Sequence, residues 1–288
     1  MTSAPATGCD SSPTFPAVHP IEAESMRRLA GMVDLSHLAH GPRAVVERVL
    51  HASADLEYAR TMLVDEEAVA AGVEALRSGS PVVTDVEMTR AGLHQGLRYG
   101  TPTGSAEGRA RCYLAEARRS VDAGGDTISA RAMSIAIAKH PEGALFVVGC
   151  APTALERLVD AIGAGQVVPA LVIGLPVGFV GAAESKAALA DCQVPFVTNV
   201  GSKGGSAVAA AAANALYRLS VAGVAGGDDA VASRPAEPAV ASWPAEPTGP
   251  AETSGHGANG ASTGGPAERR ADGEAVTSRG GSGAVVRR

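Results

Sequence analysis

One histidine of this chain has neighbours that could make it an acid–base catalyst. His51 lies four residues after Glu47 and four before Asp55, in a segment whose apolar residues have helical spacing. Residues four apart share one face of a helix, so either carboxylate could orient the imidazole ring and hold its proton. Histidine titrates near neutral pH, as a general acid requires. The alternative is an ordinary histidine on a solvent-exposed helix face.

Two glycine-containing turns could bind anions. One is GSKGGS at residues 201–206, and the other is GCAPTA at residues 149–154; each precedes a helix-like stretch. The first backbone N–H groups of a helix have no partner within it and favour negative charge, so two such turns suggest a ligand with several carboxylates. A turn that needs glycine only for its backbone conformation is the alternative. The residues that we expect to contact the ligand here are Gly149, Thr153, Lys203, Gly204, Gly205 and Ser206.

Charged residues elsewhere add further candidates. Asp85 directly follows a short apolar strand, a common place for catalytic side chains in α/β sheets, although an aspartate there could equally cap a helix. Arg48 precedes His51 by three residues, and Arg111 and Arg131 belong to an arginine-rich middle region. A guanidinium group pairs well with carboxylates, but most arginines are merely solvated, and that alternative stays open for each.

Several other classes of site lack their motifs. GLPVGFVG is not a GxGxxG dinucleotide motif, and GSKGGS is not a GxxxxGK[ST] phosphate loop. The chain has no GxSxG sequence, and its other histidines lack metal-ligand spacing, so we expect no metal. Four dispersed cysteines without a CxxC pair argue against disulfides and zinc and fit a reducing cytoplasm.

Composition divides the 288 residues into three parts. Beyond about Gly223 the chain has no Leu, Ile, Phe, Tyr or Met, and Trp243 is its only large apolar residue. Such a segment buries too little apolar surface to offset the entropy of ordering, so we expect disorder at residues 1–14 and 223–288 around one domain at residues 15–222. The net charge of −6 argues against a nucleic-acid or anionic-membrane partner. No apolar run is long enough to span a bilayer.

The domain alternates helices with short strands. Helices are expected at residues 20–34, 42–60, 65–79, 114–123 and 129–140, and strands near residues 81–85 and 111–114. Three strand–turn–helix units follow, whose strands are ALFVVG, ALVIG and PFVTNV. This order predicts an α/β fold with an open, mostly parallel five-stranded sheet flanked by helices as a three-layer sandwich. The expected buried stripe of the second helix is Val45, Val49, Ala52 and Leu56.

Together these segments resemble the precorrin-8X methylmutase family, including its cobalt-precorrin-8 branch. The resemblance covers about residues 19–219 and lies in IEAES, RVLHASADLEY, VVTDVEMTRAGL, ARCYLAEAR, VVGCAPTAL, GLPVGFVGAAESKAAL and VGSKGGSAVAAAAANAL. It implies an isomerase of corrin-ring biosynthesis, on the route to vitamin B12. Such an enzyme moves a methyl group between neighbouring carbons of pyrrole ring C, giving hydrogenobyrinate, or cobyrinate when cobalt is already bound.

The resemblance also implies site residues and partners. His51 matches the family's acid–base histidine, which aids a sigmatropic methyl shift by protonating the conjugated ring. No cofactor is implied, and the enzyme would be a homodimer with its tetrapyrrole near the subunit interface. The chain departs from the family at Ile128, where many members have an arginine that Arg131 could replace, and at Cys150, where asparagine is commoner. Besides the two turns, the implied substrate contacts are Ser25, Arg48, Asp85, Met88, Arg111, Thr127 and Arg131.

Two other functions remain open from the sequence. One is a carrier that binds a corrin intermediate without converting it, although the presence of His51 favours an enzyme. The other is an unrelated phosphosugar or nucleotide enzyme that uses the glycine turns for phosphate. Binding of a corrinoid or of a nucleotide would distinguish these classes.

Overall fold

The computed structural model describes residues 19–99, 109–119 and 125–222, and all of them belong to one compact unit, Met1–Ala232. The segments expected to be disordered, 1–14 and 223–288, lie outside the described residues, so their prediction stays open. Among the described helices, none is both long and apolar enough to cross a membrane.

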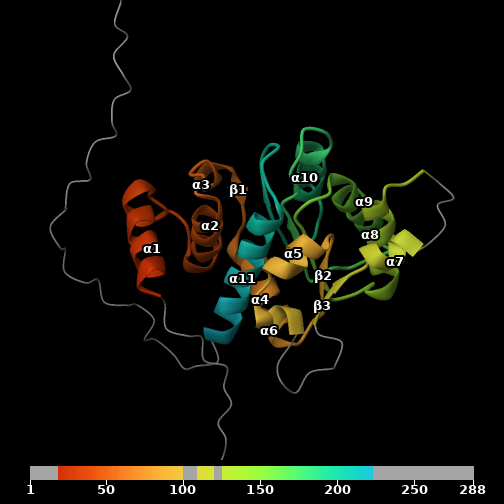
Figure 1. Ribbon diagram of the computed structural model, residues 1–288, viewed down its shortest axis with the longest axis horizontal. Coiled ribbons are helices and arrows are strands. Elements are labelled where there is room, and N and C mark those ends of the chain that lie inside the picture. The colour runs from red at the N-terminus through yellow and green to blue at the C-terminus, as the bar shows by residue number, and fades with distance from the viewer. Residues whose placement is uncertain (1–18, 100–108, 120–124, 223–288) are drawn as a thin grey trace, which may run out of the picture. The chain divides into compact units, whose positions relative to one another are not determined.

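The described residues form an α/β fold around one six-stranded sheet (Figure 1). Its order is β1-β6-β5-β4-β2-β3; β1 pairs antiparallel with β6, and all other neighbours are parallel. The fold class and the five predicted strands are confirmed. The sixth, β1, was not predicted because two residues carry no strand periodicity. The strands are β1 (Met62–Leu63), β2 (Val82–Thr84), β3 (Ala110–Cys112), β4 (Leu145–Val148), β5 (Leu171–Gly174) and β6 (Phe196–Asn199).

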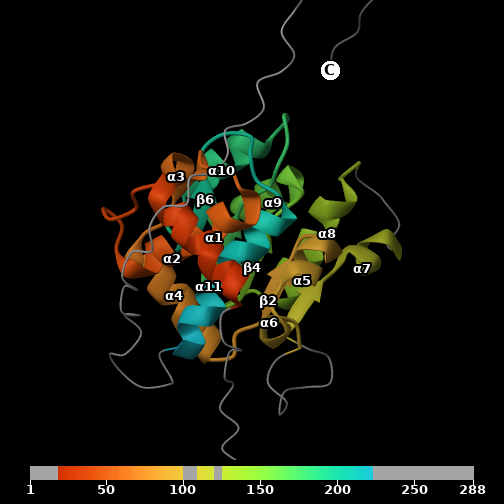
Figure 2. The same cartoon turned by 60° about the vertical axis from the view of Figure 1, so that its left-hand side comes forward.

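Helices cover both faces of the sheet, as Figures 1 and 2 show. One face packs against α2 (His40–Ser53), α4 (Glu66–Arg77) and α11 (Ser206–Ala222), with α1 (Pro20–Met32) on the outer side of α2. The other face packs against α8 (Ile128–Lys139), α9 (Pro152–Gly163) and α10 (Ala182–Ala190). Successive strand residues alternate between these two cores, as the period of two requires. The shorter helices are α3 (Tyr58–Thr61), α5 (Glu87–Gly92), α6 (Gln95–Tyr99) and α7 (Leu114–Arg119).

The helix that carries His51 is shorter than predicted. The expected helix at residues 42–60 ends at Ser53, and Ala54 adopts a left-handed conformation with φ of 52°. The Ser53 hydroxyl accepts a hydrogen bond from the Asp55 amide, and the Asp55 carboxylate accepts one from the Glu57 amide. Such local side-chain bonds offer the backbone an alternative to the helix, which explains the break.

The predicted buried stripe of this helix is therefore half wrong. Val45 and Val49 are buried as expected, and Leu50 is buried beside them. Leu56 is exposed because the helix ends at Ser53, and Ala52 is exposed although it still lies within the helix.

The parallel strands have a doubly wound order that locates the ligand edge. Without β1, the order is β3-β2-β4-β5-β6, so the direction of winding reverses between β2 and β4. Ligands of such sheets bind outside the carboxyl ends of the strands, near this reversal. Asp85 follows β2 and Gly149 follows β4, so two predicted site residues lie at the reversal.

Candidate active site at the carboxyl edge of the sheet

The His51 ring has a serine partner rather than a carboxylate partner. His51 lies half-buried in the last turn of α2, and its Nδ1 is 3.0 Å from Oγ of Ser25 on α1. In the described part of the chain the ring has no hydrogen bond with Glu47 or Asp55, so the prediction that one of these orients it is wrong. Asp55 lies beyond the helix end and pairs with Lys203 instead. With Nδ1 occupied by Ser25, Nε2 is the atom available for proton exchange with a ligand.

An ion pair sets the register between the two helices that carry Ser25 and His51. Nη1 of Arg48 lies 2.5 Å from Oε1 of Glu22, and Nη1 of Arg218 lies 3.2 Å from the same oxygen. Burial opposes ionisation of Glu22, but hydrogen bonds and charges from both arginines hold its pKa below the ordinary value. Glu22 precedes Ser25 by three residues, and Arg48 precedes His51 by three. The ion pair therefore lies one helical turn from the Ser25–His51 contact and supports it.

The turn after β4 binds an anion, but that anion is the protein's own Asp85. Asp85 is only 3% exposed, and its carboxylate accepts hydrogen bonds of 2.7 to 3.1 Å from the amides of residues 149–151. It also accepts bonds from the Val86 amide and the Thr89 hydroxyl. The prediction that these amides, including that of Gly149, wait for a substrate carboxylate is wrong. Asp85 is neither an open catalytic group nor the N-cap of α5, which is Val86.

The GSKGGS turn is likewise engaged within the protein. Nζ of Lys203 lies 2.5 Å from Oδ2 of Asp55 and 2.7 Å from Oε2 of Glu57, and the Gly205 amide donates to the carbonyl of Leu175. Hydrogen bonds to the two carboxylates raise the pKa of Lys203 above its ordinary value. Both groups therefore already have partners within the protein, and substrate contacts by Lys203 and Gly205 stay predictions. The ion pairs of Lys203 connect the turn to the segment that follows the His51 helix.

Two further residues of this turn pack closely against neighbouring elements. A Cβ atom at Gly204 would lie 2.3 Å from the carbonyl oxygens of both Leu175 and Pro176, so only glycine fits there. The Thr89 hydroxyl donates to the Asp85 carboxylate, and it lies 3.0 Å from the Ser206 hydroxyl. Substrate contacts by Gly204 and Ser206 stay predictions.

Beneath the same turn lies a buried lysine that sequence reasoning missed. Lys186 of α10 is 1% exposed, and its Nζ lies 3.0 Å from Oδ1 of Asn199 and 2.5 Å from the carbonyl oxygen of Lys203. Burial lowers the pKa of Lys186 to about 8. The available signal was a lysine among the small and apolar residues of AAESKAALA, where a buried cation is unusual.

A second group of predicted residues meets at the starts of α8 and α9. Thr127 caps α8 by accepting from the Ala130 amide, and its hydroxyl lies 2.7 Å from that of Thr153 on α9. Both threonines line a cavity of about 250 Å³. Nη1 of Arg131 donates to the carbonyl of Asp126 at 2.8 Å, so Arg131 lies at this end of α8. The structure thus brings three predicted contacts to one place.

Exposed apolar side chains extend the carboxyl edge. Met88 on α5 is 73% exposed, and the loop after β5 presents Phe179 and Val180 at 100% and 86% exposure. Phe179 and Val180 were not predicted as site residues. The signal was present, since PVGFVG places an aromatic residue in the loop that follows a buried strand, in a chain that is only 3% aromatic. Arg111 lies separately on β3, where its carbonyl accepts from Thr84.

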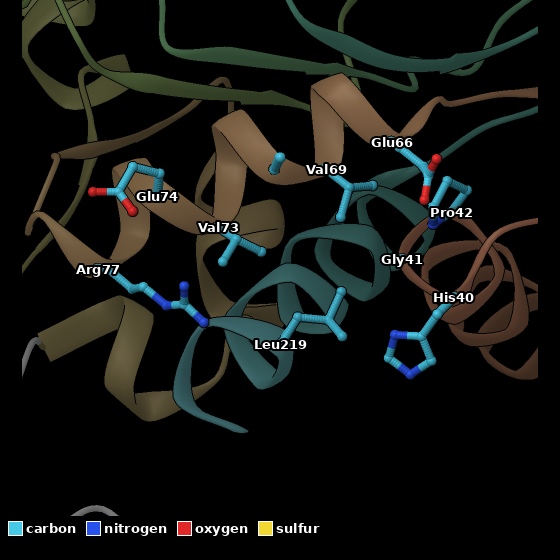
Figure 3. Close-up of a pocket in the computed structure, with 10 residues that line it drawn as sticks. His40, Gly41, Pro42, Glu66, Val69, Val73, Glu74, Arg77 and Leu219 are labelled. Carbon is cyan, nitrogen blue, oxygen red and sulfur yellow. The ribbon is translucent and has the colours of Figure 1, made fainter. Parts of the chain in front are cut away.

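A cavity elsewhere in the fold holds none of the predicted site residues. It measures about 480 Å³ and lies between the start of α2, helix α4 and the end of α11 (Figure 3). Its lining includes His40, Glu66, Glu74 and Arg77. Within the described ranges, no group of histidine, cysteine, aspartate and glutamate side chains is arranged to hold a metal ion.

Comparison with known proteins gives one consistent family. Residues 20–219 match the family model described as precorrin-8X methylmutase. The chain is 43% identical over 183 residues to a cobalt-precorrin-8 methylmutase of Priestia megaterium, covering 62% of this chain and 78% of the relative. It is 42% identical over 201 residues to a precorrin-8X methylmutase of Pseudomonas aeruginosa, covering 68% and 89%.

A solved structure agrees with these relatives. The precorrin-8X methylmutase of Thermus thermophilus superposes with a TM-score of 0.62 at 36% identity, covering 70% of this chain and 96% of that one. The match of the family model spans more than half of the chain. The chain belongs to the precorrin-8X methylmutase family.

Proposed function

We propose that this protein is the isomerase that converts precorrin-8X or its cobalt-containing form in cobalamin biosynthesis, with His51 as its proton donor and acceptor. The observation that carries the proposal is the contact between His51 Nδ1 and Ser25 Oγ, in a chain of the methylmutase family. A methyl shift within one ring needs no net oxidation and no second substrate. One positioned acid and a shaped site are enough.

The Ser25 contact defines how His51 can work. A serine hydroxyl can accept a hydrogen bond from the N–H that imidazole carries at Nδ1, and this leaves Nε2 as the nitrogen that gains and loses a proton. His51 donates the Nε2 proton to the conjugated ring system, the methyl group moves to the neighbouring carbon, and Nε2 takes a proton back. The product has the same atoms as the substrate.

The substrate's two kinds of surface fit different parts of the edge. A tetrapyrrole has broad apolar faces, which suit the exposed side chains of Met88 and Phe179. Its acidic rim suits hydroxyl groups and guanidinium groups, which Thr127, Thr153 and Arg131 bring to the starts of α8 and α9. The amides of residues 149–151 have Asp85 as their partner, so they do not serve the rim.

We further propose that the enzyme is a homodimer that works in the cytoplasm. Phe179 and Val180 form an apolar surface that a second subunit or the substrate would cover. Light scattering at micromolar concentration should give twice the chain mass, and a monomer mass would contradict the dimer. The cytoplasmic location rests on the dispersed cysteines of the sequence.

The direct test is conversion of defined substrates. Purified protein is mixed separately with precorrin-8X and cobalt-precorrin-8, and the absorbance spectrum and product mass are followed with time. We expect a spectral change at constant mass with at least one substrate, and comparing the two rates identifies the natural one. Binding without conversion would instead support a carrier. Binding of a nucleotide but of neither corrin precursor would support a phosphate-dependent enzyme.

A further inference from the structure

The ammonium group of Lys186 has no carboxylate partner among the described residues, although it is almost completely buried. Its two partners are neutral oxygens, the side-chain carbonyl of Asn199 and the backbone carbonyl of Lys203. Burying a cation against neutral groups costs free energy that an apolar side chain of similar length would not. The contacts made by Lys186 therefore serve a purpose other than simple core packing.

Those contacts hold the inside of the turn at residues 200–205. Asn199 Nδ2 donates to the carbonyls of Val200 and Lys203, so Lys186 and Asn199 together bind the Lys203 carbonyl from two sides. The turn contains Gly201 with φ of +91° and Gly205 with φ of +133°. Glycine gives the turn conformational freedom, and the buried hydrogen bonds select one conformation.

The outside of the same turn reaches the end of the His51 helix. The side chain of Lys203 pairs with Asp55 and Glu57, which follow the helix end at Ser53 by two and four residues. The Val200 amide also donates to the carbonyl of Thr61, so the turn holds the segment between α2 and β1 at two points. A continuous path of contacts therefore runs from Lys186 through Lys203 to the last turn that carries His51.

We propose that Lys186 is a positioning residue for His51, acting through the carbonyl and the side chain of Lys203. The proposal rests on the proposed function, because positioning matters only if His51 exchanges protons with the substrate. Lys186 does not touch the substrate itself. It fixes the turn, and the turn fixes the end of α2 relative to the sheet.

The test compares Lys186→Met and Lys203→Met, singly and together, with Lys139→Met as the matched control. Lys139 is also a paired lysine, but it binds Glu116 at the far end of α8. We expect each site variant to lower kcat about 10- to 100-fold, as small misplacements of catalytic groups do, with KM within about twofold. Because both lysines act along one path, the double variant should lose little more than either single variant. Lys139→Met should match the wild type.

A second readout reports on the ring directly. Imidazole NMR signals are followed through a pH titration, and the His51 signal is assigned by its loss in His51→Ala. We expect Lys186→Met and Lys203→Met to shift the His51 signal in the same direction. If Lys186→Met does not fold, Lys186→Gln, which keeps a donor, and Lys203→Met, which alters an exposed group, still decide the question.

Two outcomes would overturn the positioning role. One is an unchanged His51 signal in folded Lys186 variants, and the other is a double variant whose loss in kcat is the product of the two single losses. If the wild type converts neither corrin precursor, the proposed function fails while the NMR comparison still tests the path.

Discussion

The two glycine turns at the carboxyl edge are held by internal charges of opposite sign. The turn after β4 directs amides inward at residues 149–151, and the buried carboxylate of Asp85 binds them. The turn after β6 directs the carbonyl of Lys203 inward, and the buried ammonium of Lys186 binds it. A glycine-rich motif does not reveal which backbone group it directs inward. The sign of the buried partner does.

Asp85 and Lys186, which we call the anchors of the first and second turn, also differ in how many hydrogen-bond partners their charged groups have. Among the described residues, Asp85 accepts five hydrogen bonds, four from backbone amides and one from the Thr89 hydroxyl, and the bond from the Gly149 amide is buried. Lys186 has two neutral acceptors, and its burial opposes its charge. We therefore expect the first turn to depend on its anchor for folding and the second to depend on its anchor mainly for geometry.

Loss of the Asp85 carboxylate should have the largest effect on stability. Asp85→Ala leaves the amides of residues 149–151 without their acceptor, and breaking such a buried charged network costs about 3–5 kcal/mol. Thermal unfolding should show a melting temperature lower by roughly 6–20 °C for a domain of this size. Glu87→Ala, which removes a more exposed carboxylate on α5, is the control. A variant at Asp85 that melts within about 2 °C of the wild type would show that the first turn does not need its anion.

Because Lys186 is buried, the free energy of unfolding of the protein should increase as the pH rises. Burial lowers the pKa of Lys186 from the ordinary 10.5 to about 8, so between these values the unfolded chain binds more protons than the folded one. Raising the pH through this window therefore increases the free energy of unfolding, by at most about 3 kcal/mol. The other charged residues on α9, on α10 and in the adjoining turn are present in both the wild type and Lys186→Met; they are Glu156, Arg157, Asp160, Glu184 and Lys203.

Chemical denaturation at pH 7 and pH 10 checks this prediction. Lys186→Met lacks the titrating group, so its free energy of unfolding should miss the increase seen in the wild type. Groups common to both proteins cancel in the difference. Equal pH dependence of the two proteins would show that Lys186 is not a buried cation.

Loss of the exposed Lys203 side chain should have the smallest effect on stability. Lys203→Met removes ion pairs to Asp55 and Glu57 that lie in solvent, and such pairs contribute little to folding. The melting temperature should hardly change, in low or high salt, although kcat should fall. A large loss of stability would mean that the two turns depend on their outer contacts as much as on their buried anchors.

Sequence patterns predicted the elements of this fold well. Short apolar runs that end in turns located β2, β4, β5 and β6, and Asp65 marked the start of α4, where its side chain caps the helix. The pairing of β1 with β6 could not be predicted, because strand β1 is defined by its partner rather than by its two residues.

The site was only partly predictable for a related reason. His51 stood out by residue type, but its partner Ser25 lies 26 residues away on another helix, and Asp85 lies 64 residues from Gly149. Contacts between distant segments depend on how the elements pack, and local spacing does not encode that. Ser25 was predicted from the family resemblance. Lys186 was missed because its one local signal, a lysine among the small and apolar residues of α10, does not reveal the carbonyl that it binds.

The central claim is that His51 transfers the proton, and the turnover of His51→Ala tests it most directly. The single-turnover rate of methyl migration is measured for the wild type, for His51→Ala and for His37→Ala, which alters an exposed histidine away from the Ser25 contact. We expect His51→Ala to be ~10²–10⁴-fold slower, as for loss of a general acid, while the corrin ligand still binds and the fold is unchanged. His37→Ala should match the wild type. A rate for His51→Ala within a few-fold of the wild type would contradict the account.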